Sequence, residues 1–198
     1  MQKVKICGIT NYEDALQAIN AGADALGFVF YPKSPRYIKP EDAKKIISKL
    51  PPFVEKVGLF VNEDAKTINK QAQQSSITLI QLHFETEKAL SESLVLPHIQ
   101  VVRMQSTQDL HNLDKDRYYL VDAFCETYGG SGKRLNLEWF EGKDCSRLIL
   151  AGGLTPDNVD QTLSYNFYGV DVSSGTEQSK GKKDPSKVSS FIKKAKSC

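Results

Sequence analysis

The chain has 198 residues, 40% of them hydrophobic and 25% charged, which is typical of a globular protein long enough to bury a sizeable core. Its 26 basic and 24 acidic residues leave a net charge of +2, so it lacks the basic field expected of a nucleic-acid-binding protein. No apolar run approaches the roughly 20 residues that span a membrane, and we expect no membrane partner.

Eight apolar runs recur along the chain and are predicted to be strands. They are Val4–Cys7, Ala25–Phe30, Val54–Val61, Ile77–Leu82, Ile99–Val102, Tyr118–Val121, Leu148–Leu150 and Tyr168–Val172. Most of these runs are continuous rather than alternating, as expected for strands covered on both faces. A helical stretch is predicted after each run.

Helix-start chemistry recurs between the runs, in the form of a capping residue, a proline at the first helical position, or both. These positions are Asn11, Pro40, Thr155 with Pro156, and Asp184 with Pro185. Gly22 follows the first predicted helix, where a left-handed cap is common. Lys180–Lys183 is interpreted as a short basic loop, and Lys193–Lys196 as a solvated last helical turn rather than a nucleic-acid patch.

Strict alternation of strands and helices predicts a parallel sheet. Eight units fit a single α/β domain over residues 1–198, a (β/α)8 TIM barrel with short loops near the lower size limit of roughly 200 residues. The alternative is an open, doubly wound sheet. Its usual glycine fingerprint is missing from the first turn, Cys7-Gly8-Ile9-Thr10, which favours the barrel.

A barrel gathers the carboxyl ends of its strands onto one face, so the polar residues at those ends can be considered together. They are Cys7, the Ser34–Arg36 loop, Asn62, Gln81, His83, Arg103, Asp122, Gly152, Gly153, Asp171, Ser173, Ser174 and Gly175. The two glycine- and serine-rich turns after strands 7 and 8 mark the usual phosphate position of this fold. We therefore expect a phosphorylated small molecule as substrate.

Each single residue has an alternative interpretation. Cys7 could be a small buried hydrophobic residue, Asp122 a cap or a lysine partner, Arg36 a surface ion pair, and His83 a structural residue. Their common placement on one predicted face favours a functional site.

Gly129–Lys133 is a glycine-rich loop that invites comparison with a nucleotide-binding loop. The P-loop pattern fails here, because Thr127 stands where its first glycine belongs and Arg134 where serine or threonine belongs. The loop after strand 6 is better interpreted as a mobile lid.

Four cysteines, Cys7, Cys125, Cys145 and Cys198, show no Cys-x-x-Cys motif, and only three histidines accompany them. This spacing predicts no metal site. The first strand begins almost at Met1, which leaves no room for a signal peptide, so we expect free thiols in the cytoplasm.

These residues together resemble the phosphoribosylanthranilate isomerase family of tryptophan biosynthesis, and the resemblance runs essentially end to end. The matching motifs are Lys5–Thr10, Gly27–Phe30 with Ser34–Arg36, Val57–Asn62, Gln81–His83, Gly129–Lys133, Gly152–Pro156 and Val170–Gly175. The resemblance implies an Amadori rearrangement, in which N-(5′-phosphoribosyl)anthranilate becomes 1-(2-carboxyphenylamino)-1-deoxyribulose 5-phosphate.

The resemblance also implies roles for individual residues. Asp122 would be the general acid that opens the ribose ring, Cys7 the general base that removes the C2 proton, and Arg36 the ligand of the anthranilate carboxylate. Gly153, Ser174 and Gly175 would face the phosphate. No metal or organic cofactor is implied, because the imine supplies the electron sink.

The implied roles need a protonated aspartate and an ionised thiol, which reverses both ordinary protonation states. Burial would raise the pKa of Asp122, while Arg36 and helix N-termini would lower the pKa of Cys7.

Three positions depart from the family pattern: Phe84 replaces glycine, Asn136 replaces aspartate and Lys180 replaces proline. Phe84 could change loop packing near the pocket. Two other functions stay open, a related sugar-phosphate isomerase such as that of the histidine pathway and a non-catalytic ligand-binding barrel. The oligomeric state, monomer or homodimer, is also open.

Overall fold

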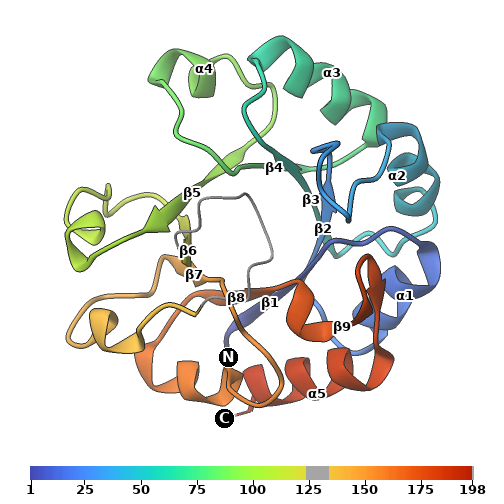
Figure 1. The fold of residues 1–198 in the computed structure, drawn as a ribbon. Helices are drawn as coiled ribbons and strands as arrows, with labels where there is room; N and C mark the ends of the chain where they lie inside the picture. Colours follow the sequence, from blue (N-terminus) through green and yellow to red (C-terminus); the bar gives the residue numbers. More distant parts are fainter. Residues whose placement is uncertain (124–133, 198) are drawn as a thin grey trace.

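Eight parallel strands form a closed barrel in the computed structural model, which describes residues 1–123 and 134–197. The strands are β1 (Lys3–Cys7), β2 (Ala25–Val29), β3 (Glu55–Phe60), β4 (Leu79–Leu82), β5 (His98–Met104), β6 (Tyr119–Ala123), β7 (Leu148–Leu150) and β8 (Gly169–Val172). Each pairs with its sequence neighbours, and β8 closes the ring on β1, where Asp171 lies opposite Lys5. Figure 1 shows this ring with the helices outside it. The predicted barrel is confirmed, and the open sheet is wrong.

Five α-helices in the described part of the chain cover part of the barrel's outer surface. They are α1 (Tyr12–Asn20), α2 (Pro40–Ile47), α3 (Ala65–Ser75), α4 (Lys88–Glu92) and α5 (Pro185–Ala195). The side chain of Asn11 caps α1 by accepting from the amide of Asp14, and Asp184 caps α5 in the same way. Gly22, just beyond α1, has the positive φ of 102° expected of a left-handed cap.

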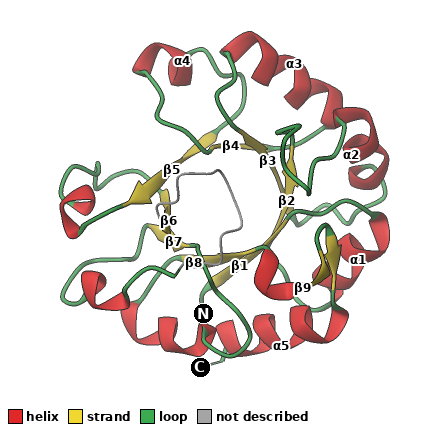
Figure 2. Cartoon of the chain, viewed as in Figure 1, coloured by secondary structure: helices red, strands yellow, loops and turns green. Residues whose placement is uncertain are grey.

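Within residues 1–123 and 134–197, no α-helix lies between β5 and β8, which departs from the prediction of a helix after every strand, whereas α5 follows β8 as predicted. Short 3-10 helices follow β5, β6, β7 and β8, namely η1 (Thr107–Leu110), η2 (Leu137–Phe140), η3 (Val159–Tyr165) and η4 (Ser174–Thr176). Figure 2 shows the longer helices after the early strands and at the C-terminus, with shorter helical turns after β5 and β6.

The helix predicted to begin at Thr155 and Pro156 is wrong, because the chain forms a turn there and η3 begins only at Val159. The hydroxyl of Thr155 accepts from the amide of Asp157, and the Asn158 side chain accepts from the amide of Thr155. These local side-chain bonds compete with helical hydrogen bonding, which explains the turn.

The core has two layers because side chains alternate along each strand. Val4 and Ile6 of β1 pack in the outer layer between strands and helices, together with the large rings of Phe28 and Phe191. Lys5 and Cys7 occupy the alternate positions of the same strand, so they point into the barrel. This alternation delivers a charged side chain and a thiol to the barrel interior.

A two-stranded antiparallel hairpin follows η4, formed by β9 (Glu177–Ser179) and β10 (Lys182–Lys183). Gly181 turns the hairpin with a φ of 80°, beside Lys180, which replaces the family's proline. The hairpin is tied to α1 because the amide of Lys183 donates to Asp14 at 2.7 Å. In Figure 1 it lies beside α1, at the rim of the barrel.

None of the helices within the described ranges is both long enough and apolar enough to cross a membrane.

Candidate active site

One cavity at the carboxyl ends of the strands brings together most of the polar side chains predicted for the site. Cys7, Arg36, Asp122, Asp171 and Ser173 all line it, although they come from four parts of the chain. Gln81 and His83 line the same cavity, while Asn62 and Arg103 line a separate hollow. The predicted convergence of strand ends is therefore confirmed for the thiol, the carboxylate and the guanidinium.

Cys7 lies at the end of β1 and is 4% exposed. Gly27 of β2 stands directly opposite, and a Cβ atom at Gly27 would lie 2.7 Å from the thiol sulfur. The carbonyl of Gly27 also accepts from the amides of Gly8 and Ile9, which fixes the turn after the thiol. Glycine is thus required at position 27 to leave room for the Cys7 side chain.

A buried ion pair lies beside the Cys7 thiol in the barrel interior. Lys5 Nζ is 2.7 Å from Asp171 Oδ1, and both side chains are almost wholly buried. Burial raises the pKa of Cys7, and the positive charges of Lys5 and Lys183 oppose that rise without reversing it. The predicted lowering of the thiol pKa is therefore wrong, because desolvation outweighs the nearby cations.

The pKa of Asp122 is raised, as a general acid at neutral pH requires. Burial raises its pKa to about 6, and the negative charge of Asp171 adds to that rise. About a tenth of the side chain is then protonated at pH 7, against about 0.1% for an ordinary aspartate.

His83 Nε2 lies 3.8 Å from Asp122 Oδ2. Burial, together with the charges of Arg103 and Lys5, lowers the pKa of His83 to about 4. The imidazole is neutral at pH 7, so it leaves Asp122 without a charged histidine partner.

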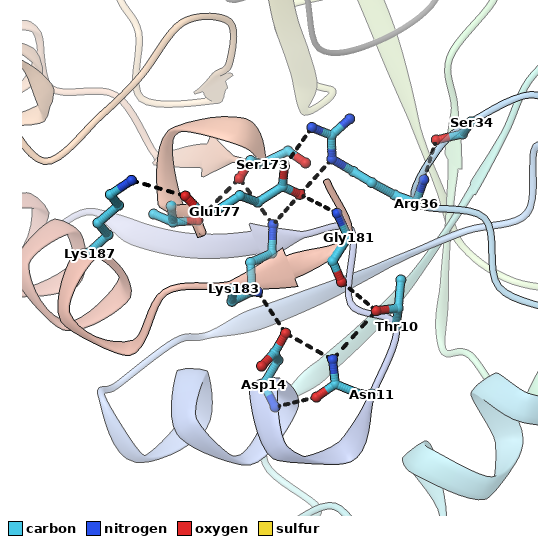
Figure 3. A network of polar contacts seen from close by, with 11 residues as sticks. Thr10, Asn11, Asp14, Ser34, Arg36, Ser173, Glu177, Gly181, Lys183 and Lys187 are labelled. Carbon is cyan, nitrogen blue, oxygen red and sulfur yellow. Dashed lines mark hydrogen bonds and ion pairs between the residues drawn. The ribbon is translucent and has the colours of Figure 1, made fainter. Parts of the chain in front are cut away.

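Arg36 is a buried residue, 8% exposed, so the alternative of a surface ion pair is wrong. Its Nε and Nη2 atoms each donate to a carboxylate oxygen of Glu177 at 2.7 Å. Its aliphatic stem crosses Gly8, where a Cβ atom would lie 2.6 Å from Arg36 Cδ. Figure 3 shows the guanidinium extended toward Glu177 and Ser173.

The two turns predicted to hold phosphate touch each other. Gly152 and Gly153 after β7 both have positive φ, of 86° and 62°. A Cβ atom at Gly175, in η4 after β8, would lie 1.9 Å from the carbonyl oxygen of Leu154. Glycine at position 175 is therefore what lets the chain after β8, which includes Ser174, pack against the turn after β7.

Three charged residues of the site were missed from sequence: Lys5, Glu177 and Lys183. Lys183 was assigned to a short basic loop, but it is only 1% exposed and forms an ion pair with Glu177. A usable signal existed for Lys5, because a residue two positions before Cys7 in the same strand must share the thiol's face.

The three departures from the family pattern lie away from this cavity. Phe84 is buried in the outer core and lines the separate hollow rather than this cavity, and its effect on loop packing near the pocket stays a prediction. Asn136 caps η2 by accepting from the amide of Glu138, as an aspartate could. The predicted lid, Gly129–Lys133, lies outside the described residues.

The family model for N-(5′-phosphoribosyl)anthranilate isomerase matches residues 4–194. The chain belongs to this family. It is accordingly an isomerase of the aldose–ketose class, with the barrel fold of its relatives.

Individual relatives agree with the family match. The N-(5′-phosphoribosyl)anthranilate isomerase of Sulfurovum sp. (strain NBC37-1) is 62% identical over 195 residues, covering 98% of this chain and 99% of the relative. The crystal structure of the Thermotoga maritima isomerase has a TM-score of 0.89 at 43% identity, with 99% of each chain covered.

A further crystal structure of the family contains a ligand. It is a phosphoribosylanthranilate isomerase in complex with reduced 1-(o-carboxyphenylamino)-1-deoxyribulose 5-phosphate. It is 42% identical to this chain, has a TM-score of 0.85 and covers 99% of each chain.

Proposed function

We propose that this chain converts N-(5′-phosphoribosyl)anthranilate into 1-(2-carboxyphenylamino)-1-deoxyribulose 5-phosphate, a step of L-tryptophan biosynthesis. The observation that carries the proposal is the cavity at the barrel mouth, where a thiol, a carboxyl with a raised pKa and a buried guanidinium meet. Acid, base and carboxylate ligand are the three groups that this rearrangement needs.

The chemistry begins with proton transfer from Asp122 to the ribose ring oxygen. The bond from C1 to that oxygen breaks, and the anthranilate nitrogen supplies the electron pair that forms the imine. The pKa of Cys7 is raised by burial, so the minor thiolate fraction of Cys7 is the base that then removes the C2 proton. The electrons of that C–H bond move to the imine nitrogen to give an enolamine. Tautomerisation protonates C1 and leaves a ketone at C2, so C1 is reduced, C2 is oxidised, and no external redox partner takes part.

Substrate recognition divides between the two ends of the molecule. Arg36 holds the anthranilate carboxylate by charge-assisted hydrogen bonds. Gly152, Gly153, Ser174 and Gly175 hold the phosphate with backbone amides, in the usual phosphate position of this fold.

Asp171 and Ser173 line the cavity, and we propose that they contact the sugar. The Ser173 hydroxyl is buried and has no hydrogen-bond partner among residues 1–123 and 134–197, which leaves it available to a ligand.

The enzyme works as one barrel domain in the cytoplasm. It needs no metal or organic cofactor, because the imine of the substrate is the electron sink. Within the described part of the chain, no group of three or more His, Cys, Asp or Glu side chains could hold a metal ion. Its oligomeric state is either a monomer or a homodimer, which size-exclusion chromatography with light scattering distinguishes.

The experiment that tests this function compares two substrates on the purified chain. Loss of anthranilate fluorescence on addition of phosphoribosylanthranilate, with formation of the ketone product, is the expected result. Turnover of the histidine-pathway aminoaldose alone would favour the related isomerase, and turnover of neither would favour a non-catalytic barrel.

A further inference from the structure

The side edge of the Arg36 guanidinium is held by a carboxylate that is far away in the sequence. Glu177, in the first strand of the β9–β10 hairpin, accepts from Nε and Nη2 of Arg36 at 2.7 Å each, and both residues are buried. This is a bidentate pair along the side edge of the guanidinium. Figure 3 shows Arg36 and Glu177 approaching each other from opposite elements of the barrel rim.

Glu177 is itself fixed by two further donors. Its Oε1 accepts from Lys183 Nζ at 3.2 Å and from the amide of Gly181 at 3.4 Å. Lys183 Nζ also donates to the carbonyl of Ser173 at 3.0 Å, and its amide donates to Asp14. Burial alone would raise the pKa of Glu177, but the Arg36 hydrogen bond and the Lys183 charge outweigh it and lower the pKa, which keeps the carboxylate ionised.

We propose that Glu177, backed by Lys183, is a positioning residue that locks Arg36 and reserves the end edge of its guanidinium for the substrate carboxylate. This inference rests on the proposed function and deepens it. Arginine has five N–H donors, and Glu177 takes one from Nε and one from Nη2. The end edge of the guanidinium, formed by Nη1 and the second N–H of Nη2, remains for the planar carboxylate of the substrate.

The charges of the cluster support the same assignment. Arg36 and Lys183 are cationic and Glu177 is anionic, so these three buried groups carry one net positive charge. A bound carboxylate brings the cluster to neutrality, which removes an uncompensated buried charge. With Glu177 alone behind Arg36, the pair would already be neutral and would attract a carboxylate only weakly. Lys183 therefore restores the attraction that Glu177 would otherwise cancel.

The test measures calorimetric binding of two ligands. One is reduced 1-(2-carboxyphenylamino)-1-deoxyribulose 5-phosphate, and the other is its anilino counterpart without the carboxylate. The readout is the ratio of their affinities, because a merely structural defect weakens both ligands alike. Glu177→Gln keeps the side-chain volume but replaces the bidentate carboxylate that holds Nε and Nη2 of Arg36 with an amide that has one acceptor oxygen. The cluster gains one positive charge in this variant, so a fall in the preference for the carboxylate can come only from lost positioning of Arg36. We expect that preference to fall about tenfold and binding of the anilino ligand to change less than about twofold, and a rise in the preference would overturn the proposal. An unchanged preference in Glu177→Gln would overturn the proposal.

A matched pair in the hairpin controls for loss of fold. Lys183→Met removes the charge behind Glu177 and should lower the same preference, whereas Lys182→Met, one residue earlier and bonded to Asp14 instead, should leave it unchanged. This pair decides the question if Glu177→Gln does not fold, and equal effects of the two lysine variants would overturn the positioning role.

Arg36→Met separates this inference from the proposed function. If wild type and Arg36→Met show the same ligand preference, the carboxylate clamp itself is wrong, and the role of Glu177 falls with it. If Arg36→Met loses the preference but Glu177→Gln keeps it, only the positioning role is overturned.

Discussion

Replacing Asp122 with asparagine is expected to stabilise the fold while removing the catalytic acid. The pKa of Asp122 rises from 3.8 to about 6 on folding, because burial and the Asp171 charge disfavour the ionised form. A carboxyl with a raised pKa binds its proton more tightly in the native state, so the native state loses stability as pH rises through this window. At 1.36 kcal/mol per pKa unit, the ionised form costs about 3 kcal/mol at pH 7 and about 1 kcal/mol at pH 4.5.

Asparagine keeps the shape of the side chain and its acceptor for the amide of Ala123, but it carries no charge to desolvate. The Asp122 side chain is 22% exposed, so solvent screens only a small part of the cost. For a chain of this length, about 3 kcal/mol corresponds to a Tm rise of about 6–12 °C at pH 7. A gain in stability at the expense of activity is the usual sign of a strained functional residue.

The assay is urea unfolding of wild type and Asp122→Asn at pH 7 and pH 4.5, followed by circular dichroism. Asp14→Asn is the matched control, because burial raises the pKa of Asp14 but hydrogen bonds from Lys182 and Lys183 outweigh it and lower the pKa. That variant should lose stability at pH 7, the opposite sign. An Asp122→Asn protein no more stable than wild type at pH 7 would refute the raised pKa and the burial argument behind it.

Three further outcomes are expected. Arg36→Met should weaken binding of carboxylate-bearing ligands about 10- to 150-fold and leave aniline analogues nearly unchanged by calorimetry, whereas an equal loss for both would remove the clamp. The reduced product analogue should raise the Tm far more than its dephosphorylated form, and equal protection would mean that the turns after β7 and β8 do not recognise phosphate. Lys5→Met should raise the pKa of the Cys7 thiol, because it removes a positive charge that lowers this pKa. The pH dependence of Cys7 alkylation, followed by mass spectrometry of the Cys7 peptide, should then shift to higher pH, and a shift to lower pH would contradict the prediction.

The barrel was predictable because its signals are local in the sequence. Continuous apolar runs such as Leu148–Leu150 report burial on both faces, and parallel topology alone then brings their ends together. Cys7, Asp122 and Asp171 reach one cavity for that reason. The 3-10 turns were missed because side chains such as Asn158 bond nearby amides and compete with the helix.

The electrostatics of the site were not predictable, because they depend on contacts between distant parts of the chain. Arg36 and Glu177 are separated by 141 residues, and no local pattern pairs them. The rise in the Cys7 pKa likewise reflects a balance between burial and the charges of Lys5 and Lys183. Sequence identified the thiol, the carboxyl group and the guanidinium, and the fold decided their charged partners and their charge states.

The central claim, that Cys7 and Asp122 carry out an isomerisation in the barrel cavity, is tested most directly by turnover. Wild type, Cys7→Ala and Asp122→Asn are each mixed with N-(5′-phosphoribosyl)anthranilate, and the decay of anthranilate fluorescence is followed. We expect turnover by wild type and a loss of about 10²–10⁴ in kcat for each variant, with binding of the reduced product analogue retained. Either variant keeping more than about a tenth of the wild-type kcat would contradict the assignment of base and acid.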